Sequence, residues 1–265
     1  MPRPRLDGPT LRRLGSRARR EAVGLRNRIE DARLVVEQRR LVLGPAHRAW
    51  RGNSVIVNRD RWNGWDWTRA GEEWTASPEW KDALIGDVLD RLIPDRAVLV
   101  EIGPGAGRWS RALLGHATKL ILVDVSSRPL DLCRREFAGA ENVEYVLCAG
   151  SDLAGVAADS VDGIWSFDVF VHIAPVDQAG YLDEISRVLR PGGVAVIHHA
   201  DGRNRGHRPS RHGWRAPMSR GLFAALAADR GLAVERQFDS WGPSGEFDLS
   251  AYADAFTVLR KQARV

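Results

Sequence analysis

The residues that most clearly point to chemistry are three glycines and one carboxylate. The glycines follow a strand pattern at 98–102 and stand at alternate positions: Gly103, Gly105 and Gly107. Glycine carries no Cβ and tolerates positive φ, so a ligand can touch the backbone of such a turn. A helix after the turn presents free N–H groups and its positive end to that ligand. A second apolar run ends at Asp124, where an acid is placed to bind ribose hydroxyls. Together these residues predict a cofactor that contains adenosine.

Two adenosine cofactors compete for this turn. A dinucleotide site has the spacing G-x-G-x-x-G, whose third glycine lets helix and strand pack closely. This chain has G-x-G-x-G, with Arg108 where that third glycine would fall. Glu101 also precedes the turn, and a carboxylate there repels a pyrophosphate but suits the ammonium group of S-adenosylmethionine. The sequence resembles the class I S-adenosylmethionine-dependent methyltransferases, whose first motif reads acid-x-G-x-G-x-G.

The elements that must position these residues extend the resemblance over 100–200. The pattern predicts strands at 142–147, 161–168 and 194–199 and helices at 126–137 and 181–189, the second ended by Arg190-Pro-Gly-Gly193. Strand–helix repeats form a parallel sheet covered on both faces. The resemblance implies a doubly wound, mostly parallel, seven-stranded Rossmann-like α/β sheet. It also implies cofactor contacts, with Asp152 holding the adenine amino group, at Glu101, Gly103, Gly105, Gly107, Asp124, Ser126, Ser151, Asp152 and Ser166.

The sequence also narrows the atom that receives the methyl group. Family members that act on base or amide nitrogens often carry a proline pair after the fourth strand, and this chain has none there. Methylation of pyrimidine carbon usually needs a nucleophilic cysteine, whereas Cys133 and Cys148 lie in predicted core elements. Transfer to oxygen is the simplest remaining reaction. A hydroxyl needs a base to remove its proton as the new bond forms, and histidine is the usual base at neutral pH.

Candidate bases lie where strands end, because open α/β sheets bind ligands at the carboxyl ends of their strands. We predict His172 as the base, with Asp168 orienting it or contacting the substrate, and His199 as the second candidate. His198 and His199 must point to opposite faces because side chains alternate along a strand. Mg²⁺ is an alternative aid to catalysis, with Asp168, His199 and Asp201 as ligands, although the sequence does not show an octahedral oxygen arrangement.

Six of the ten tryptophans lie between residues 50 and 80. Rigid aromatic faces interleaved with polar residues suit a sugar, which alternates C–H faces with hydroxyls; the alternative is that these rings dock the N-terminal arm. A polar loop at 206–215 follows the fifth strand, and long inserts are commonly functional. The predicted substrate contacts are Trp65, Trp67, Glu73, Trp74, Trp214 and Arg215. The combined pattern resembles bacterial polysaccharide-associated O-methyltransferases, and within them the mycobacterial enzymes of methylated mannose polysaccharides, which implies a mannose-type acceptor.

An N-terminal arm carries the positive charge of the chain. Residues 1–51 hold 14 arginines against five acidic residues, whereas the remainder has an acidic excess. Apolar residues recur every three or four positions along 11–36, as in a helix that packs on its own domain or on a second subunit in a homodimer. A basic amphipathic helix on an anionic membrane surface is the next interpretation. Nucleic-acid binding is disfavoured because no aromatic residue interrupts the arginines before Trp50.

These features predict an Arg-rich helical arm at 1–50, a Trp-rich lid or cap segment at 51–93 and an S-adenosylmethionine-binding methyltransferase domain at 94–265. No signal peptide or long apolar span is present, so we expect a cytoplasmic protein. We predict an O-methyltransferase acting on a hydroxyl of a sugar or oligosaccharide. One alternative is a small-molecule O- or N-methyltransferase of secondary metabolism. The other is a membrane- or nucleic-acid-binding module with a non-catalytic cofactor site.

Overall fold

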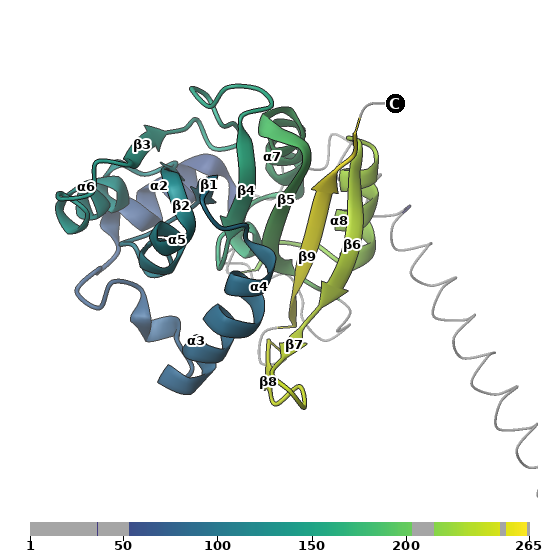
Figure 1. Cartoon of the computed structure of the whole chain (residues 1–265), viewed down its shortest axis with the longest axis horizontal. Coiled ribbons are helices and arrows are strands. Elements are labelled where there is room, and N and C mark those ends of the chain that lie inside the picture. Colours follow the sequence, from purple (N-terminus) through teal and green to yellow (C-terminus); the bar gives the residue numbers. More distant parts are fainter. Residues whose placement is uncertain (1–35, 37–52, 203–214, 250–252, 264–265) are drawn as a thin grey trace, which may run out of the picture.

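A seven-stranded sheet forms the centre of the computed structural model, which describes residues 36, 53–202, 215–249 and 253–263. Its strand order is β3-β2-β1-β4-β5-β9-β6 (Figure 1). The strands are β1 (Ala97–Ile102), β2 (Ala117–Asp124), β3 (Val143–Leu147), β4 (Val161–Ser166), β5 (Leu189–Ala200), β6 (Leu232–Phe238) and β9 (Asp254–Lys261). All neighbours pair in parallel except β9, which runs antiparallel to β5 and to β6. The predicted doubly wound, mostly parallel sheet is confirmed.

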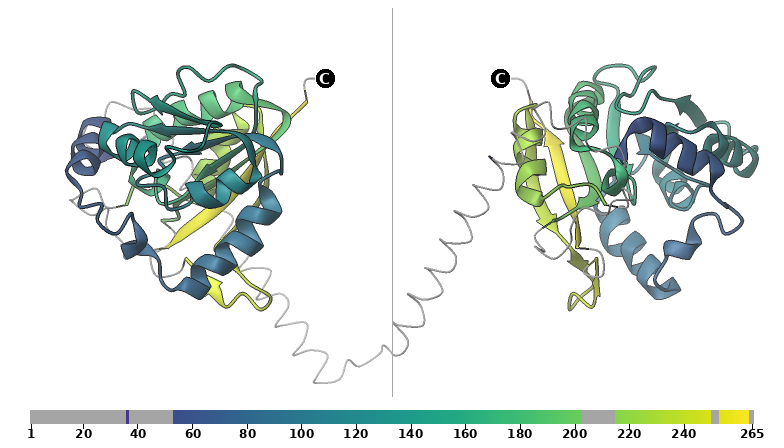
Figure 2. Two further views of the ribbon diagram at one scale, coloured as in Figure 1. Left: turned by 60° about the vertical axis from the view of Figure 1, so that its left-hand side comes forward. Right: turned by 180° about the vertical axis from the view of Figure 1, so that it is seen from behind.

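Helices cover both faces of this sheet because the central strands are apolar on both sides. One core contains Val100 and Ile102 of β1 together with α7 (Pro175–Val188) and α8 (Arg220–Ala228). The other contains Leu99 of β1 together with α3 (Pro78–Leu84), α5 (Ser110–His116) and α6 (Ser127–Glu136). Figure 2 shows α7 and α8 in front when the molecule is seen from behind. Alternate residues of one strand therefore enter different cores.

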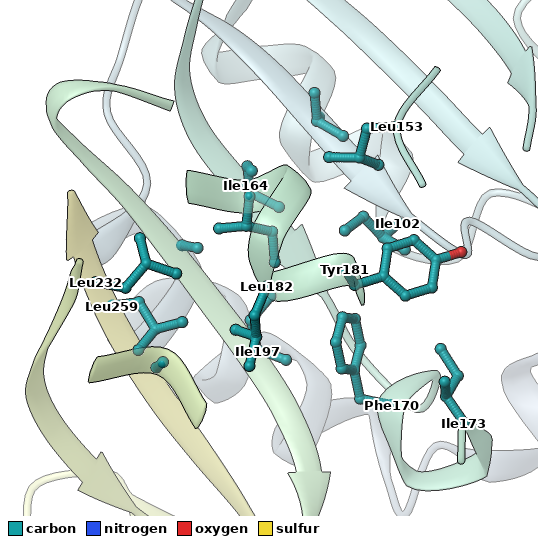
Figure 3. Packing of buried hydrophobic residues seen from close by; sticks show 14 of the residues in the cluster. Ile102, Leu153, Ile164, Phe170, Ile173, Tyr181, Leu182, Ile197, Leu232 and Leu259 are labelled. Carbon is teal, nitrogen blue, oxygen red and sulfur yellow. The ribbon is translucent and has the colours of Figure 1, made fainter. Parts of the chain in front are cut away.

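The core beneath α7 reaches the loop that follows β4. Phe170 of the short helix η5 (Phe170–His172) is fully buried and packs against Tyr181 of α7, with ring centroids 5.4 Å apart. Figure 3 shows these two rings with Ile102 at the end of β1. Apolar packing thus fixes the backbone next to His172.

The predicted element boundaries are mostly reproduced, with one difference around α7. This helix begins at Pro175 rather than near Tyr181, because proline suits the first helical position. It ends at Val188, and β5 begins at the next residue, so the segment 190–193 that was predicted only to terminate the helix lies within β5. This segment is the irregular stretch between the pairs Val161–Leu189 and Gly163–Val194. Gly192 has φ 82°, which glycine adopts without strain.

The Trp-rich segment forms α2 (Val55–Gly64), η3 (Glu72–Trp74), α3, η4 (Ile85–Leu89) and α4 (Asp90–Leu92). Trp80 of α3 anchors this segment to the sheet. Its indole N–H donates to the carbonyl of Asp248, in the small hairpin of β7 (Ser240–Trp241) and β8 (Phe247–Asp248). Its ring lies 5.2 Å from that of Trp241 and 6.4 Å from that of Trp109. Some tryptophans of the segment therefore serve packing.

The predicted arm at 1–50 lies outside the described residues except for Val36, and so do most of the loop at 206–215 and Trp214. The predictions of a homodimer or membrane contact through the arm stay predictions. Within the described ranges, no helix combines the length and the apolar character needed to span a bilayer.

Candidate functional site

A single cavity joins the glycine turn to the Trp-rich segment. It encloses about 860 Å³ of empty space, part of it open to solvent. Its walls come from the Trp-rich segment, including α2, and from the turn after β1, the end of β2 and the loop after β4. The carboxyl ends of neighbouring parallel strands meet there, as expected for a ligand site in an open α/β sheet.

The glycine turn is built so that side chains cannot replace its glycines. Gly103 has φ 73°, and a Cβ placed on it would lie 2.3 Å from a methyl carbon of Val169. Gly105 has φ 57°, and a Cβ there would meet the ring of Trp67 at 3.0 Å. Both glycines line the cavity, whereas Gly107 packs against Phe137 and does not. The turn thus exposes backbone to the cavity on one side and packs tightly on the other.

Two carboxylates flank this turn, and only one of them lines the cavity. Asp124 lines it at the end of β2 and is 8% exposed. Burial raises the pKa of Asp124 to about 7, although hydrogen bonds from backbone N–H groups, including that of Ser126, oppose the rise. Glu101 lies behind the turn, where it accepts a 2.5 Å hydrogen bond from the Ser110 hydroxyl. Burial also raises the pKa of Glu101 to about 7. Glu101 therefore supports the turn instead of facing the cavity.

Three predicted serine contacts lie outside the cavity wall. Ser166 is fully buried and donates to the carbonyl of Ile102 at 2.9 Å, which ties β4 to the end of β1. Ser126 is also fully buried and donates to the carbonyl of Arg59 in α2 at 3.3 Å. Ser151 packs next to Gly180 of α7. In this structure these residues support the site rather than line it.

The acid after β3 is engaged with its own loop. Asp152, predicted to hold adenine, accepts hydrogen bonds from the backbone N–H groups of Ala149 at 2.8 Å and Ala154 at 3.1 Å. It does not line the cavity, whereas Gly150 and Asp177 of the same region do. Asp177 lies in the first turn of α7. This edge of the cavity therefore presents a different carboxylate from the one predicted.

Asp168 lies in the cavity wall directly after β4, held by a guanidinium and an imidazole. Arg108 donates to its carboxylate at 2.8 Å and to the carbonyl of Gly71 at 3.0 Å. The backbone N–H of Asp168 donates to Nδ1 of His198 at 3.0 Å. Burial tends to raise the pKa of Asp168, but the charge and hydrogen bond of Arg108 prevail and lower it. Asp168 is thus an ionised hydrogen-bond acceptor rather than a base.

His172, the predicted base, is buried in the same wall. It is 5% exposed, and its ring meets that of Trp62 edge-on with centroids 5.2 Å apart. Its backbone carbonyl accepts hydrogen bonds from the side-chain amides of Asn53 at 2.9 Å and Asn58 at 2.8 Å. The partners that the structure gives Asp168 are Arg108 and His198, and the two asparagines hold the backbone carbonyl of His172 rather than its ring.

His199, the second predicted base, is placed away from the cavity. It is fully buried on the α8 face, stacked on Phe223 at 4.1 Å, and its Nε2 lies 2.6 Å from the hydroxyl of Thr257. Burial lowers the pKa of His199 to about 4. Strand alternation sends His198 to the opposite face, where it stacks on Phe167 at 4.3 Å. Of the two imidazoles that end β5, the one next to the cavity wall is therefore His198.

The residues suggested for Mg²⁺ are not gathered in one place. Asp201 forms an ion pair with Arg220 at 2.7 Å, while His199 faces Thr257. Among the described residues, no group of three or more His, Cys, Asp or Glu side chains is arranged to hold a metal ion. The geometry therefore gives no support to the suggested magnesium site.

Aromatic rings of the Trp-rich segment form another part of the cavity wall, and the ring of Trp67 lies against the glycine turn. Trp62, Trp67 and Trp74 line the cavity, with Trp62 and Trp74 edge-on at 6.0 Å. Trp65 stacks behind Trp74 at 5.2 Å, and its indole N–H donates to Glu73 at 2.9 Å. Of the predicted substrate contacts, Trp67 and Trp74 reach the cavity, whereas Trp65 and Glu73 support it from behind.

The last described residue of the predicted substrate set, Arg215, is bound to a buried acid. It donates to Asp254 of β9 at 3.1 Å, and Asp254 lies 3.5 Å from Nε2 of His198. Arg215 does not line the cavity, and Asp254 and His198 lie between it and the cavity wall.

Sequence reasoning missed several residues of the wall, among them Arg108, Trp62 and Asn58. Arg108 and Trp62 carried signals, since Arg108 stands where the expected glycine is absent and Trp62 belongs to the tryptophan cluster. Asn58 carried none, because a single asparagine on a polar helix has no distinguishing pattern.

Comparison with known proteins finds methyltransferases that are similar to part of this chain. Residues 100–197 match the family model described as a methyltransferase domain. A demethylmenaquinone methyltransferase from Clavibacter sepedonicus is 34% identical over 119 residues, which are 42% of this chain and 47% of that protein. A Mycobacterium avium protein named "Putative O-methyltransferase" is 28% identical over 63% of this chain and 74% of its own length. The chain spans less than half the length of the demethylmenaquinone methyltransferase and of two further bacterial relatives.

Solved structures share the fold. A TehB-like S-adenosylmethionine-dependent methyltransferase from Corynebacterium glutamicum superposes with a TM-score of 0.54 over 83% of this chain and 100% of that chain, at 20% identity. Residues 100–197 are thus similar to a methyltransferase domain, and the sheet around them has the Rossmann-like fold of this solved structure.

Proposed function

We propose that this protein transfers the methyl group of S-adenosylmethionine to a hydroxyl group of a sugar or oligosaccharide. The observation that carries the proposal is the shared cavity. It combines a glycine turn and a strand-end acid with a histidine and a wall of tryptophans. The first pair suits an adenosine cofactor and the second pair suits a hydroxylated acceptor.

The cofactor side fits S-adenosylmethionine in two respects. The backbone of Gly105 faces the cavity at a position where a Cβ has no room. Asp124 offers a buried carboxylate, which ribose hydroxyls could satisfy with two hydrogen bonds. Gly103, Gly105 and Asp124 would thus hold the cofactor, which supplies an electrophilic methyl group when bound.

The acceptor side favours a sugar among hydroxyl compounds. Trp62, Trp67 and Trp74 provide apolar faces, and Asp168 provides an ionised acceptor for neighbouring hydroxyls. The relative from Mycobacterium avium carries O-methyltransferase in its name. A mannoside is our first choice of acceptor, on the resemblance described above.

His172 is the proposed base. The acceptor hydroxyl is a weak nucleophile at neutral pH, and His172 would take its proton as the new oxygen–carbon bond forms. Asn53 and Asn58 fix the carbonyl of His172, which holds its backbone while the edge of Trp62 limits its ring. Asp168 would align the acceptor by accepting hydrogen bonds.

Calorimetric titration with S-adenosylhomocysteine tests the cofactor. The protein should bind it, and Asp124→Ala should weaken binding at least tenfold because the ribose loses its charged acceptor. Asp152→Ala is the matched control, since Asp152 lies outside the cavity wall, and should leave affinity within about threefold. Absence of binding to folded wild-type protein would refute the methyltransferase proposal.

A variant of the proposed base tests the chemistry. His172→Ala should lower kcat by about 10² or more while the affinity for S-adenosylhomocysteine stays nearly constant. His199→Gln should have a far smaller effect on kcat, because His199 lies on the opposite face. Activity is followed by radioactive methyl transfer to a panel of mannosides, other sugars, and quinol and amine acceptors. An unchanged rate in His172→Ala would remove it from the mechanism, and transfer to quinols or amines alone would replace the sugar.

A further inference from the structure

Asn58 has a side-chain orientation that its neighbours determine. It lies on α2, is 6% exposed and lines the cavity. Its side-chain nitrogen is 2.8 Å from the carbonyl oxygen of His172 and 3.3 Å from that of Asn53. Both neighbours can only accept hydrogen bonds, so the NH₂ group must face them. Rotating the amide would bring Oδ1 against two carbonyl oxygens. The position of Oδ1 therefore follows from the hydrogen bonds.

This orientation leaves Oδ1 of Asn58 buried without a hydrogen-bond partner. Buried polar atoms in native proteins nearly always have one, and an unsatisfied acceptor weakens the fold. The other polar groups of Asn58 are satisfied: its NH₂ group as described, and its backbone N–H by the carbonyl of Ser54 at 3.0 Å. Oδ1 of Asn58 lies beside the cavity and lacks a hydrogen-bond donor. This indicates that a bound ligand supplies the donor.

The surroundings of Asn58 agree with a role in binding. Trp62 follows it by one helical turn and also lines the cavity, so both residues share the inner face of α2. Val55, one turn earlier, packs against Gly150 so closely that a Cβ there would lie 2.4 Å away. This contact and the bonds to His172 hold Asn58 in place. Tethering alone does not require Asn58, because Asn53 donates to the same carbonyl at 2.9 Å.

We propose that Oδ1 of Asn58 accepts a hydrogen bond from an N–H or O–H group of a molecule bound in this cavity. Asn58 would then recognise a ligand in addition to holding the carbonyl of His172. The proposal rests on the proposed function, which supplies two sources for the donor. One is the ammonium or a hydroxyl of the cofactor, and the other is a hydroxyl of the methyl acceptor. The amide is neutral, so it selects for a donor group rather than for positive charge.

A pair of leucine variants separates ligand recognition from tethering. Asn58→Leu removes one donor to the His172 carbonyl together with Oδ1, whereas Asn53→Leu removes one donor to that carbonyl and leaves Oδ1. Asn53 also lines the cavity. Asn58→Leu should weaken binding of S-adenosylhomocysteine, or raise KM for the best mannoside, by about tenfold, and Asn53→Leu should have a smaller effect on both. A change in affinity for S-adenosylhomocysteine identifies the cofactor as donor, and a change in KM alone identifies the acceptor.

A second pair of variants guards against a leucine protein that does not fold. Asn58→Thr and Asn58→Val have nearly the same shape, but only threonine keeps a neutral oxygen that can accept a hydrogen bond, so Asn58→Thr should retain more affinity. Equal effects of the two leucine variants on affinity and KM, or equal effects of Asn58→Thr and Asn58→Val, would overturn the assignment. Failure of wild-type protein to bind S-adenosylhomocysteine would instead refute the proposed function, so the two failures are distinct.

Discussion

At the scale of single residues, Asp168 has a strained backbone that several contacts hold in place. It has φ 60°, a conformation that costs free energy in any residue other than glycine. Three contacts hold it there: its carboxylate to Arg108, its N–H to His198, and the stacking of His198 on the preceding Phe167. Strained backbone at a cavity wall is a common sign of a functional position. These contacts preserve the direction of the Asp168 carboxylate before any ligand arrives.

The buried carboxylate of Glu101 should make stability depend on pH. Burial raises its pKa to about 7 from an ordinary value of 4.5. Below pH 4.5 both folded and unfolded chains keep the proton. Between pH 4.5 and 7 only the folded chain keeps it, so the free energy of unfolding falls as pH rises, and the loss is complete above pH 7. Glu101→Gln removes this loss and should raise Tm at pH 8 by about 3 °C or more, with little change at pH 4.

Thermal melts at both pH values, followed by circular dichroism, measure this difference. Glu141→Gln is the control, because Glu141 is exposed in the turn before β3 and should change neither value. A Glu101→Gln protein that melts at the wild-type temperature at pH 8 would show that Glu101 is ionised in the fold without cost.

At the scale of elements, the sequence predicted the strands whose apolar pattern repeats along the chain. The apolar runs that became β1, β2, β4 and β5 were found because both faces of these strands are buried. The strand-end positions of Asp124, Asp168 and His172 followed from the same pattern. Alternation also separated His198 from His199, but it did not say which face borders the cavity. That depends on the packing of Phe223 from α8 and Phe167 from the loop after β4, which no local pattern encodes.

The Trp-rich segment was harder to predict, because its inner and outer residues are of similar types. Trp62 and Trp67 line the cavity while Trp65 lies behind, although all three are tryptophans in polar surroundings. The helix α2 has no apolar stripe that would mark its inner face, and its one fully inward polar side chain is Asn58. Which side chains face the ligand is set by the contacts of α2 with Gly150 and with the loop after β4.

The turn between β1 and α5 gives a prediction about how elements fit together. Gly103→Ala would force a residue with a Cβ into φ 73° and against Val169, which lies between Asp168 and His172. We expect a loss of stability of about 2 kcal/mol or more, and weaker binding of S-adenosylhomocysteine. Chemical denaturation and calorimetry measure the two effects.

Gly115→Ala is the matched control. Gly115 lies in α5, where no heavy atom within 4 Å would meet a new Cβ. Alanine is the better helix former, so this variant should be as stable as wild type or more stable by about 0.5–1 kcal/mol. Equal stability of the two alanine variants would contradict the tight fit seen at Gly103.

At the scale of the whole molecule, the Trp-rich segment is joined to the sheet domain at both of its ends. Asn53 receives the N–H of Ala174 at its carbonyl, and Trp80 is buried between Trp109 and Trp241. Between these anchors the segment passes over the cavity. Its described residues thus pack on the sheet domain, and the division into a lid at 51–93 and a catalytic domain at 94–265 stays a prediction.

Arg108 connects that cover to the base through one guanidinium, which binds the carbonyl of Gly71 and the carboxylate of Asp168. Asn58 makes a second connection, to the carbonyl of His172. Breaking both connections would widen the path by which a product leaves, and such openings typically take microseconds to milliseconds. Under the proposed function, we expect the departure of the spent cofactor to limit turnover, so that a burst of one methylated product per protein molecule precedes the steady state.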